Sequence, residues 1–308
     1  MAYPKVTVVG AGNVGATTAE LILLKGLADV TLVDVVDGVP QGKALDLMHM
    51  RSHEQFGPEV RGTSNYAETA GSDLVVVTAG VPRKPGMTRE DLIDVNAGIV
   101  KAVLDAALPT SPDATFIFVT NPLDVMVNLA AHISGLPKSR LMGMGGALDT
   151  ARYKYAIAKA CQVEPSAVEA MVVGAHGQGM VPLVSNAKVA GKPLSEILSP
   201  EQITEVRAET VAGGGQVVEL LKTGSAFYAP AASICQMVAA ILQDTKGTIS
   251  TCAKLEGEYG LDGLYMCVPC LLGAQGMEGV VELNLAPDEL EQLKVAATSI
   301  KGQLEGLA

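Results

Sequence analysis

The chain has 308 residues, of which 48% are hydrophobic, so it is long enough for two domains and too apolar to be disordered. Its 22 Lys and Arg residues against 33 Asp and Glu residues give a formal net charge of −11. A negative field repels phosphate backbones and anionic lipid, so we expect neither a nucleic-acid partner nor a membrane partner.

The first half of the chain alternates short apolar segments with segments of helical length. Four apolar segments are β-branched and almost continuously hydrophobic, at 6–9, 30–35, 74–78 and 115–120. Helices are predicted at 16–26, 42–53, 90–108 and 123–135, and a further strand near 140–145. Continuous hydrophobicity is typical of parallel strands that are covered on both faces. Repeated strand–helix units of this kind predict a Rossmann-type doubly wound parallel sheet.

After about Gly146 this alternation ends. The later pattern predicts a helix at 150–160, a strand at 168–174, a hairpin around Gly191, long helices at about 200–222 and 225–243, more strands and a polar C-terminal helix. We therefore expect a second, α+β domain that carries substrate and catalysis. The predicted boundaries are 1–146 and 147–308.

One stretch, Thr223 to Gln243, carries no charge and is formally long enough to cross a bilayer. It includes Pro230 and several polar residues and stands alone, so we interpret it as a buried core helix or a subunit-contact helix. The chain begins directly with a strand-like run, and no charged and then apolar leader precedes it. We expect no secretory signal.

The cysteines number five, and an odd number fits reduced thiols in a cytoplasmic protein. Cys267 and Cys270 have the spacing of a redox pair or half of a zinc site. They lie in a strand-like run, however, where residues three apart face opposite sides, and no second pair completes four ligands. His49 and His53 have helical spacing but no evident third ligand. We therefore expect no metal site.

A glycine-rich segment follows the first predicted strand and opens the first helix. It runs from Gly10 to Gly15 as G-x-G-x-x-G, and Asp34 stands nineteen residues later, at the end of the second strand. Glycines let the backbone approach a pyrophosphate, whose charge lies at the helix N-terminus. Asp34 can accept hydrogen bonds from an unmodified ribose and would repel a 2′-phosphate. The segment predicts a dinucleotide site that prefers NAD over NADP.

Charged residues that suit an anionic substrate accompany one of the four histidines. His176 lies at a predicted strand end among glycines, where a ligand can approach. Asp149 and Arg152, three apart at the start of a helix, share one face. Arg83 and Arg89 lie in a loop with proline and glycine after a strand. Each alone would be an ordinary surface charge, but together they fit proton-coupled hydride transfer on an anion.

These motifs resemble those of the lactate/malate dehydrogenase family, and over essentially the whole chain those of its lactate-dehydrogenase-like bacterial malate dehydrogenases. The matching segments are Gly10–Gly15, Asp34, Val81–Arg89, Val119–Pro122, Leu148–Arg152 and Gly174–Gly177. The resemblance implies reversible NAD-dependent oxidation of (S)-malate to oxaloacetate by a homodimer or homotetramer. A lactate dehydrogenase, or another 2-hydroxy acid dehydrogenase of the family, is the alternative.

The resemblance also implies catalytic roles. His176 would take the hydroxyl proton from malate and return it to oxaloacetate, while Asp149 would orient the imidazole. Arg89 would polarise the reacting carbonyl when its loop closes. His176, Asp149 and Arg89 are thus the expected catalytic residues.

Substrate and cofactor contacts are implied in the same way. Arg152 would hold the C1 carboxylate in a bidentate pair. Arg83, where lactate enzymes of the family usually carry Gln, would pair with the second carboxylate. The expected substrate-binding residues are Arg83, Arg89, Asn121 and Arg152. The expected cofactor-binding residues are Gly10, Ala11, Gly12, Asn13, Val14, Gly15, Asp34, Asn96, Val119 and Asn121.

One residue departs from the family pattern, because Gln178 stands where the family usually has Asp after His-Gly. An acceptor carboxylate is missing there, which changes the local hydrogen bonding and affects the expected subunit contacts, but not the role of His176.

Other interpretations explain less of the sequence. Tyr155 and Lys159 match the catalytic pair of short-chain dehydrogenases, but the glycine pattern of that family is different. NAD-dependent glycosidases share the cofactor fold but need a metal site. A non-catalytic NAD-sensing module would explain Gly10–Gly15 and Asp34 but leave the charged residues unexplained. The triple glycine 213–215 has no strand before it, so it predicts a helix break or close packing rather than phosphate binding.

Overall fold

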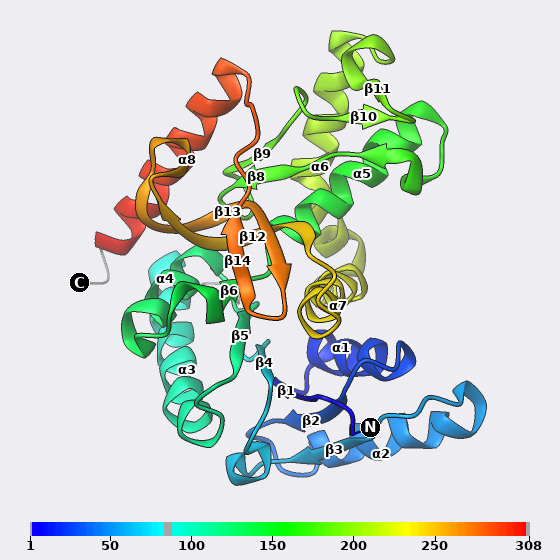
Figure 1. The fold of residues 1–308 in the computed structure, drawn as a ribbon, viewed down its shortest axis with the longest axis vertical. Helices are drawn as coiled ribbons and strands as arrows, with labels where there is room; N and C mark the ends of the chain where they lie inside the picture. Colours follow the sequence, from blue (N-terminus) through cyan, green and yellow to red (C-terminus); the bar gives the residue numbers. More distant parts are fainter. Residues whose placement is uncertain (1, 83–87, 306–308) are drawn as a thin grey trace. The chain divides into compact units, whose positions relative to one another are not determined.

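The computed structural model describes residues 2–82 and 88–305, except for the side chain of Arg89. The chain divides into two compact units (Figure 1). Unit 1 comprises Met1–Gly143, Phe227–Gly247 and Leu272–Glu278, and unit 2 comprises Met144–Ala226, Thr248–Leu271 and Gly279–Ala308.

Unit 1 contains a sheet of six parallel strands in the order β3-β2-β1-β4-β5-β6. In chain order the strands are β1 (Lys5–Val9), β2 (Asp29–Val33), β3 (Val60–Thr63), β4 (Leu74–Val77), β5 (Thr115–Phe118) and β6 (Leu141–Gly143). Every residue of β4 and β5 is buried, as the continuous hydrophobicity predicts for strands covered on both faces. The order reverses between β2-β1 and β4-β5, which creates the crevice where dinucleotides bind in such sheets.

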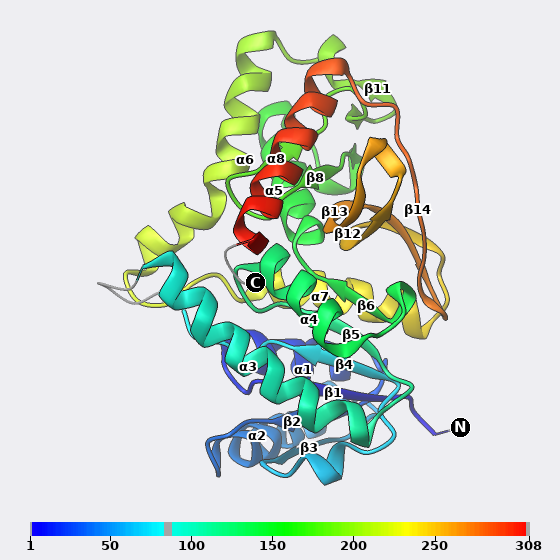
Figure 2. The ribbon, with the colours of Figure 1, turned by 90° about the vertical axis from the view of Figure 1, so that its left-hand side faces the viewer.

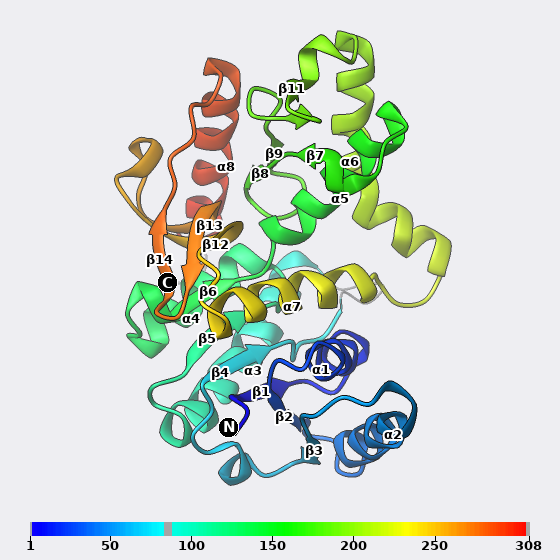
Figure 3. The ribbon, with the colours of Figure 1, turned by 45° about the vertical axis from the view of Figure 1, so that its right-hand side comes forward.

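Helices cover both faces of this sheet. They are α1 (Asn13–Leu24), α2 (Val39–Glu54), α3 (Arg89–Thr110), α4 (Leu123–Ser134) and α7 (Tyr228–Leu242), with short 3-10 helices at Tyr66–Thr69 and Lys138–Arg140. Helices α3 and α4 lie on one face (Figure 2), and α1 and α7 lie side by side on the other (Figure 3). Most of α7 is buried, which confirms a core helix in the uncharged stretch. Among the described residues, no helix combines the length and apolar character that a bilayer span requires.

Unit 2 is built from helices and antiparallel strands. Its helices are α5 (Gly146–Cys161), α6 (Pro200–Leu221) and α8 (Pro287–Glu305), and its 3-10 helices are Pro165–Ala167, Leu194–Glu196 and Glu258–Gly260. Its strands are β7 (Val168–Glu169), β8 (Val172–Gly174), β9 (Met180–Pro182), β10 (Lys188–Val189), β11 (Lys192–Pro193), most of β12 (Gly247–Glu256) and β13 (Asp262–Gly273), and part of β14 (Gly276–Val280). Helix α5 packs on α6 and on β8 (Figure 1). The predicted α/β fold class is confirmed.

Two strands differ from the sequence-based expectations. The predicted strand 168–174 is two strands in two sheets, because β7 pairs with β10 whereas β8 pairs with β9 and β13. Strand β3 was not predicted, because it lies at the sheet edge beside β2 alone and its sequence Val-Arg-Gly-Thr lacks continuous hydrophobicity. Edge strands need not be apolar on both faces.

Candidate active site

The glycine-rich loop of unit 1 is shaped by close approaches of its backbone. Gly10 has φ +102°, and a Cβ there would lie 2.7 Å from Thr78 Oγ1 and 2.8 Å from the backbone nitrogen of Ala79. A Cβ on Gly15 would lie 1.8 Å from the carbonyl oxygen of Gly10. A Cβ on Gly12, by contrast, would meet nothing within 4 Å. Two glycines therefore allow the loop to form, and the third leaves open space for a ligand.

The loop leads directly into helix α1, which begins at Asn13 after an N-cap at Gly12. No side chain caps this end, and the first turn contains no acidic residue. The N-terminal N–H groups of a helix carry partial positive charge and bind phosphate well. This end of α1 therefore fits the pyrophosphate of a dinucleotide.

A pocket of about 420 Å³ adjoins the loop within unit 1. It is lined by Val9, Gly10, Gly12, Asp34, Val35, Tyr66, Thr78, Ala79, Gly80, Val81, Ile99, Ala102 and Val103. Asp34 accepts hydrogen bonds from the N–H of Ala11 at 2.7 Å and from the N–H of Val36 at 3.1 Å. Its carboxylate thus both fastens the glycine-rich loop and reaches the pocket, as a ribose-binding residue should.

Three residues of this region escaped the sequence-based prediction. Lys43 on α2 donates from Nζ to the carbonyl oxygen of Ala11 at 2.7 Å. Tyr66 lines the pocket, and burial, together with the charge of Asp34, raises the pKa of its phenol to about 12. Thr78 donates to the carbonyl oxygens of Val9 and Gly10 at 3.0 and 3.1 Å. The position of Thr78 directly after β4, at the carboxyl edge of the sheet, is the one sequence feature that could have identified it.

Asn96, which we predicted as a cofactor contact, is buried, and its side chain forms hydrogen bonds to two loops. Its Oδ1 accepts from the N–H of Val81 at 2.9 Å, and its Nδ2 donates to the carbonyl oxygens of Val81 and Asn121 at 3.2 and 2.7 Å. Asn96 therefore joins the segments that follow β4 and β5. Asn121 itself is exposed, and Val119, half-buried, donates from its N–H to Val77.

In unit 2, the predicted Asp–His pair is present. Helix α5 carries Asp149 and Arg152 one turn apart, and His176 follows the end of β8. Asp149 Oδ2 lies 2.8 Å from His176 Nδ1, and Asp149 Oδ1 accepts from Arg152 Nη1 at 3.2 Å. The Asp149 side chain is only 1% exposed. Its buried carboxylate is therefore held between the imidazole of His176 and the guanidinium of Arg152. A carboxylate that accepts from Nδ1–H favours the tautomer in which Nε2 is the nitrogen that can take a proton.

The triple glycine of α6 lies against this cluster. A Cβ on Gly213 would be 3.5 Å from Arg152 Cδ, and a Cβ on Gly214 would be 3.4 Å from both terminal nitrogens of Arg152. A Cβ on Gly215 would meet nothing within 4 Å. Helix α6 continues unbroken to Leu221, so the glycines provide close packing and not a break. The guanidinium lies directly on the helix surface.

The side chains of two predicted arginines, Arg83 and Arg89, lie outside the described part of the chain. Arg83 lies outside the described residues. Arg89 is the first residue of α3, and its side chain lies outside the description too. The helix start itself is well defined: Thr88 Oγ1 accepts from the N–H of Asp91 at 3.0 Å, and Asp91 accepts from the N–H of Thr88 at 2.9 Å. These hydrogen bonds lower the pKa of Asp91.

Other candidate residues lie apart from this chemistry. Tyr155 is 61% exposed, and Lys159 pairs with Glu209 at 3.0 Å, which is an ordinary surface ion pair. His49 and His53 are exposed on α2. Gln178 is exposed and lines a pocket of about 420 Å³ with residues of α8.

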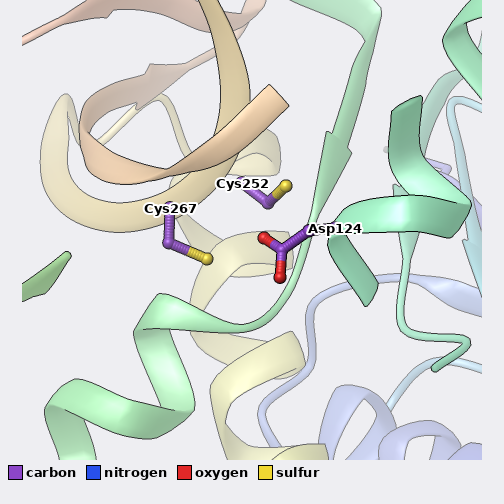
Figure 4. Close-up of side chains that lie close together, drawn as sticks. All are labelled: Asp124, Cys252 and Cys267. Carbon is purple, nitrogen blue, oxygen red and sulfur yellow. The ribbon is translucent and has the colours of Figure 1, made fainter. Parts of the chain in front are cut away.

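Three cysteines of unit 2, Cys252, Cys267 and Cys270, are buried in its strands, whereas Cys161 ends helix α5 and is half-buried. Cys267 and Cys270 both lie on β13, as predicted, and burial raises the pKa of the Cys270 thiol. The sulfurs of Cys252 and Cys267 lie within 4.8 Å of each other (Figure 4). Asp124, drawn in the same picture, belongs to unit 1. Two sulfurs by themselves do not make a zinc site.

Comparisons with known proteins agree with this geometry. The family model of the lactate/malate dehydrogenase NAD binding domain matches residues 4–143, and that of the lactate/malate dehydrogenase alpha/beta C-terminal domain matches residues 146–307. A malate dehydrogenase of Roseiflexus castenholzii is 48% identical over 99% of this chain and 98% of its own.

Solved structures of similar proteins include both activities. The malate dehydrogenase of Cryptosporidium parvum is 43% identical, with a TM-score of 0.96 and 99% of each chain covered. The lactate dehydrogenase of the same organism, complexed with lactic acid and nicotinamide adenine dinucleotide, is 38% identical, with a TM-score of 0.96 over 100% of this chain and 98% of that one. The family expected from the motifs is confirmed: the chain belongs to the lactate/malate dehydrogenase family and is an NAD-dependent oxidoreductase.

Proposed function

We propose that this chain catalyses the reversible NAD-dependent oxidation of (S)-malate to oxaloacetate. The observation that carries the proposal is the hydrogen-bonded set of His176, Asp149 and Arg152, which joins a base to a cation suited to a carboxylate. The similarity to malate dehydrogenases over nearly the full length supports the choice of substrate.

His176 handles the proton in this mechanism. Because Nδ1 donates to Asp149, Nε2 faces the substrate as the acceptor of the hydroxyl proton during oxidation. The imidazolium that results is stabilised by the buried carboxylate 2.8 Å away. In the reverse direction the same Nε2–H donates to the oxygen of oxaloacetate. A general acid–base group of this kind contributes about 10²–10⁴-fold to the rate.

Arg152 binds the C1 carboxylate. A guanidinium has five N–H donors in a planar fork, so Arg152 can hold Asp149 through Nη1 and still present donors to the substrate. The surface of α6 at Gly213 and Gly214 limits where this fork can lie. A fixed fork favours one orientation of the bound carboxylate.

The residues of unit 1 fit NAD. The open backbone at Gly12, the uncapped start of α1 and the carboxylate of Asp34 beside the pocket would hold the pyrophosphate and the ribose. Gly10, Ala11, Asn13, Val14, Gly15, Asn96, Val119 and Asn121 are proposed as the remaining cofactor-binding residues. When bound, NAD supplies the hydride acceptor. Asp34 would disfavour a 2′-phosphate, so NAD should be preferred over NADP.

Arg83, Arg89 and Asn121 complete the proposed substrate site. Malate and lactate share the C1 carboxylate, so Arg152 cannot distinguish them, whereas only malate has a second carboxylate. Arg83 would pair with that carboxylate, and Arg89 would polarise the reacting carbonyl. With pyruvate bound, a buried and unpaired Arg83 would cost about 3–5 kcal/mol. Preference for oxaloacetate over pyruvate should therefore be on the order of 10²–10⁴-fold in kcat/KM.

A panel of 2-oxo acids assayed with NADH and with NADPH tests the proposal. Oxaloacetate with NADH should be the best pair by a wide margin, and Arg83→Gln should lower oxaloacetate turnover while pyruvate turnover holds or rises. Better turnover of pyruvate by the unmodified enzyme would favour the lactate dehydrogenase alternative. Binding of NADH without turnover of any oxo acid would favour a sensing module.

Domain limits, assembly and location are also proposals. We propose an NAD-binding domain at 1–146 and a catalytic domain at 147–308, in a homodimer or homotetramer that light scattering would distinguish. The five cysteines all belong to the described residues and are thiols outside any disulfide, which supports a cytoplasmic location.

A further inference from the structure

Both backbone groups of Val172, at the start of β8, are bound by side chains. Val172 stands opposite Pro182 of β9 at a non-hydrogen-bonded position of this antiparallel pair, so its N–H and carbonyl groups point away from β9. The nearest ladder bond runs from the N–H of Leu183 to the carbonyl oxygen of Met171 at 3.0 Å. Buried backbone groups need partners, so those of Val172 must be satisfied from elsewhere.

Two hydroxyl groups from different elements provide these partners. Thr150 Oγ1 of α5 accepts from the N–H of Val172 at 3.0 Å. Ser250 Oγ of β12 donates to the carbonyl oxygen of Val172 at 2.5 Å. Val172 and Ser250 are buried. One residue of β8 is therefore fastened on its N–H side to α5 and on its carbonyl side to β12.

This fastening lies beside the proposed catalytic pair. Thr150 directly follows Asp149 on α5, and Val172 precedes His176 by four residues on the strand that leads to it. Successive side chains on a helix point about 100° apart. The contact of Asp149 with His176 alone would let α5 roll about its axis, whereas a second contact through Thr150, on another side of the same turn, opposes this rotation.

The start of α5 is fixed to the same strands by a third contact. The N–H of Gly146 donates to Cys267 Sγ at 3.2 Å, and Cys267 pairs with Gly174 of β8. A Cβ on Gly146 would lie 1.9 Å from Ser250 Oγ, so glycine is required for this approach. The helix that carries Asp149 and the strand that leads to His176 thus share one set of supports.

We propose that Thr150 is a positioning residue, which holds Asp149 in hydrogen-bonding register with His176 through the backbone of Val172. This inference rests on the proposed function insofar as it assigns the Asp149–His176 pair to proton transfer. The geometric part, that the Thr150 hydroxyl sets the contact between the two side chains, does not require turnover.

The test compares Thr150→Val, which removes the hydroxyl at nearly equal volume, with Thr150→Ser, which keeps it. The low-field proton resonance of the His176 Nδ1–H, hydrogen-bonded to Asp149, reports the contact directly. Thr150→Val should shift or broaden this resonance and lower kcat roughly ten- to hundredfold, with the Kd for NADH unchanged. Thr150→Ser should restore both properties.

Thr210→Val is the matched control. Thr210 is buried, but its hydroxyl donates to Val206 of its own helix at 2.8 Å and ties no second element. In Thr210→Val, the His176 Nδ1–H resonance and kcat should be those of the unmodified enzyme. A change in Thr210→Val as large as that in Thr150→Val would overturn the proposal, because any lost buried hydroxyl would then have the same effect.

A native resonance and a native kcat in Thr150→Val would also overturn it. If Thr150→Val does not fold, Ser250→Ala severs the other side of Val172 and should move the resonance in the same direction, while a native resonance there would refute the proposal. Failure of the proposed function appears differently. Full activity in His176→Asn would reject the mechanism, whereas the effect of Thr150→Val on the resonance would still stand.

Discussion

The two units of the molecule use glycine for opposite purposes. In unit 1, Gly10 and Gly15 let one stretch of backbone approach another, and the open backbone at Gly12 offers N–H groups to an anion. In unit 2, Gly213 and Gly214 let a side chain, the guanidinium of Arg152, lie against a helix. Unit 1 is thus suited to bind through its main chain, and unit 2 through charged side chains.

The difference determines how each unit should respond to substitution. A binding site made of backbone fails when an added atom prevents its shape, whatever the chemistry of that atom. A site made of side chains fails when a charge or a titratable group is removed, even if its shape remains. Substitutions that change only the shape of a site, or only its charge, therefore distinguish binding through backbone from binding through side chains.

The largest effect is expected from a purely chemical change in unit 2. His176→Asn keeps a similar volume but removes the titratable base, so kcat should fall by roughly 10²–10⁴-fold. The Kd for NADH should stay near normal, because unit 1 carries the proposed cofactor site. His132→Asn, on the exposed surface of α4, is the matched control. Near-full activity in His176→Asn would reject the mechanism.

A purely steric change in unit 1 should come next. The Cβ of Gly15→Ala would meet the Gly10 carbonyl oxygen at 1.8 Å, so the loop must shift. We expect a stability loss of about 1–3 kcal/mol and a clear loss of NADH affinity. Gly12→Ala meets no protein atom and should fold normally but bind NADH more weakly. Thermal melts and fluorescence titrations with NADH would measure both effects.

Gly98→Ala serves as the control for these glycine changes. It lies exposed within α3 with nothing within 4 Å of an added Cβ, so it should gain up to about 1 kcal/mol of helix stability without affecting NADH. Normal NADH binding by Gly12→Ala would show that the pyrophosphate does not lie there.

The same contrast explains what the sequence could predict. Most of the expected cofactor residues belong to one contiguous motif with Asp34 at a set spacing, so a local pattern predicted them, whereas Asn96, Val119 and Asn121 were implied only by the family resemblance. Asp149 and Arg152 share a helix face by spacing alone, His176 stands out at a strand end among glycines, and the family resemblance implied the role of each. The structure brings these three together as expected.

Residues whose role depends on long-range register could not be predicted. Nothing local marks Thr150 or Ser250, because their role follows from the packing that brings both hydroxyl groups to the backbone of Val172. Similarly, the lack of a side chain at Gly214 is informative only once α6 is known to pack against Arg152.

Helix starts were missed for a related reason. Helix α1 begins at Asn13 and not at Ala16, and α5 begins at Gly146 and not at Thr150. Gly146 has poor intrinsic helix propensity, but its N–H is bound by Cys267 Sγ, a tertiary contact that spacing and propensity do not reveal.

Asp34 combines binding through backbone with binding through side chains, because its carboxylate accepts hydrogen bonds from the backbone of the glycine-rich loop. Asp34→Asn keeps an oxygen for the N–H of Ala11, now 2.7 Å away, but removes the charge that would repel a 2′-phosphate. The preference for NADH over NADPH should fall by about tenfold, equivalent to about 1.4 kcal/mol. Asp37→Asn removes an equal charge from the neighbouring exposed loop and should leave the preference intact. An equal loss of the preference for NADH in both variants would indicate that the overall negative charge of this region, and not Asp34 itself, disfavours NADPH.

The smallest expected effect tests whether the glycines of α6 serve the arginine. The Cβ of Gly214→Ala would lie 3.4 Å from both terminal nitrogens of Arg152, at the limit of van der Waals contact, so we expect a small displacement of the guanidinium. Bonds to charged groups are worth about 1.5–3 kcal/mol, and a partial loss should raise KM for oxaloacetate roughly three- to tenfold, with little change in kcat. Gly215→Ala, one residue on and without contacts to an added Cβ, should leave KM unchanged while gaining the same helix propensity. Equal KM values in the two variants would show that α6 does not set the position of Arg152.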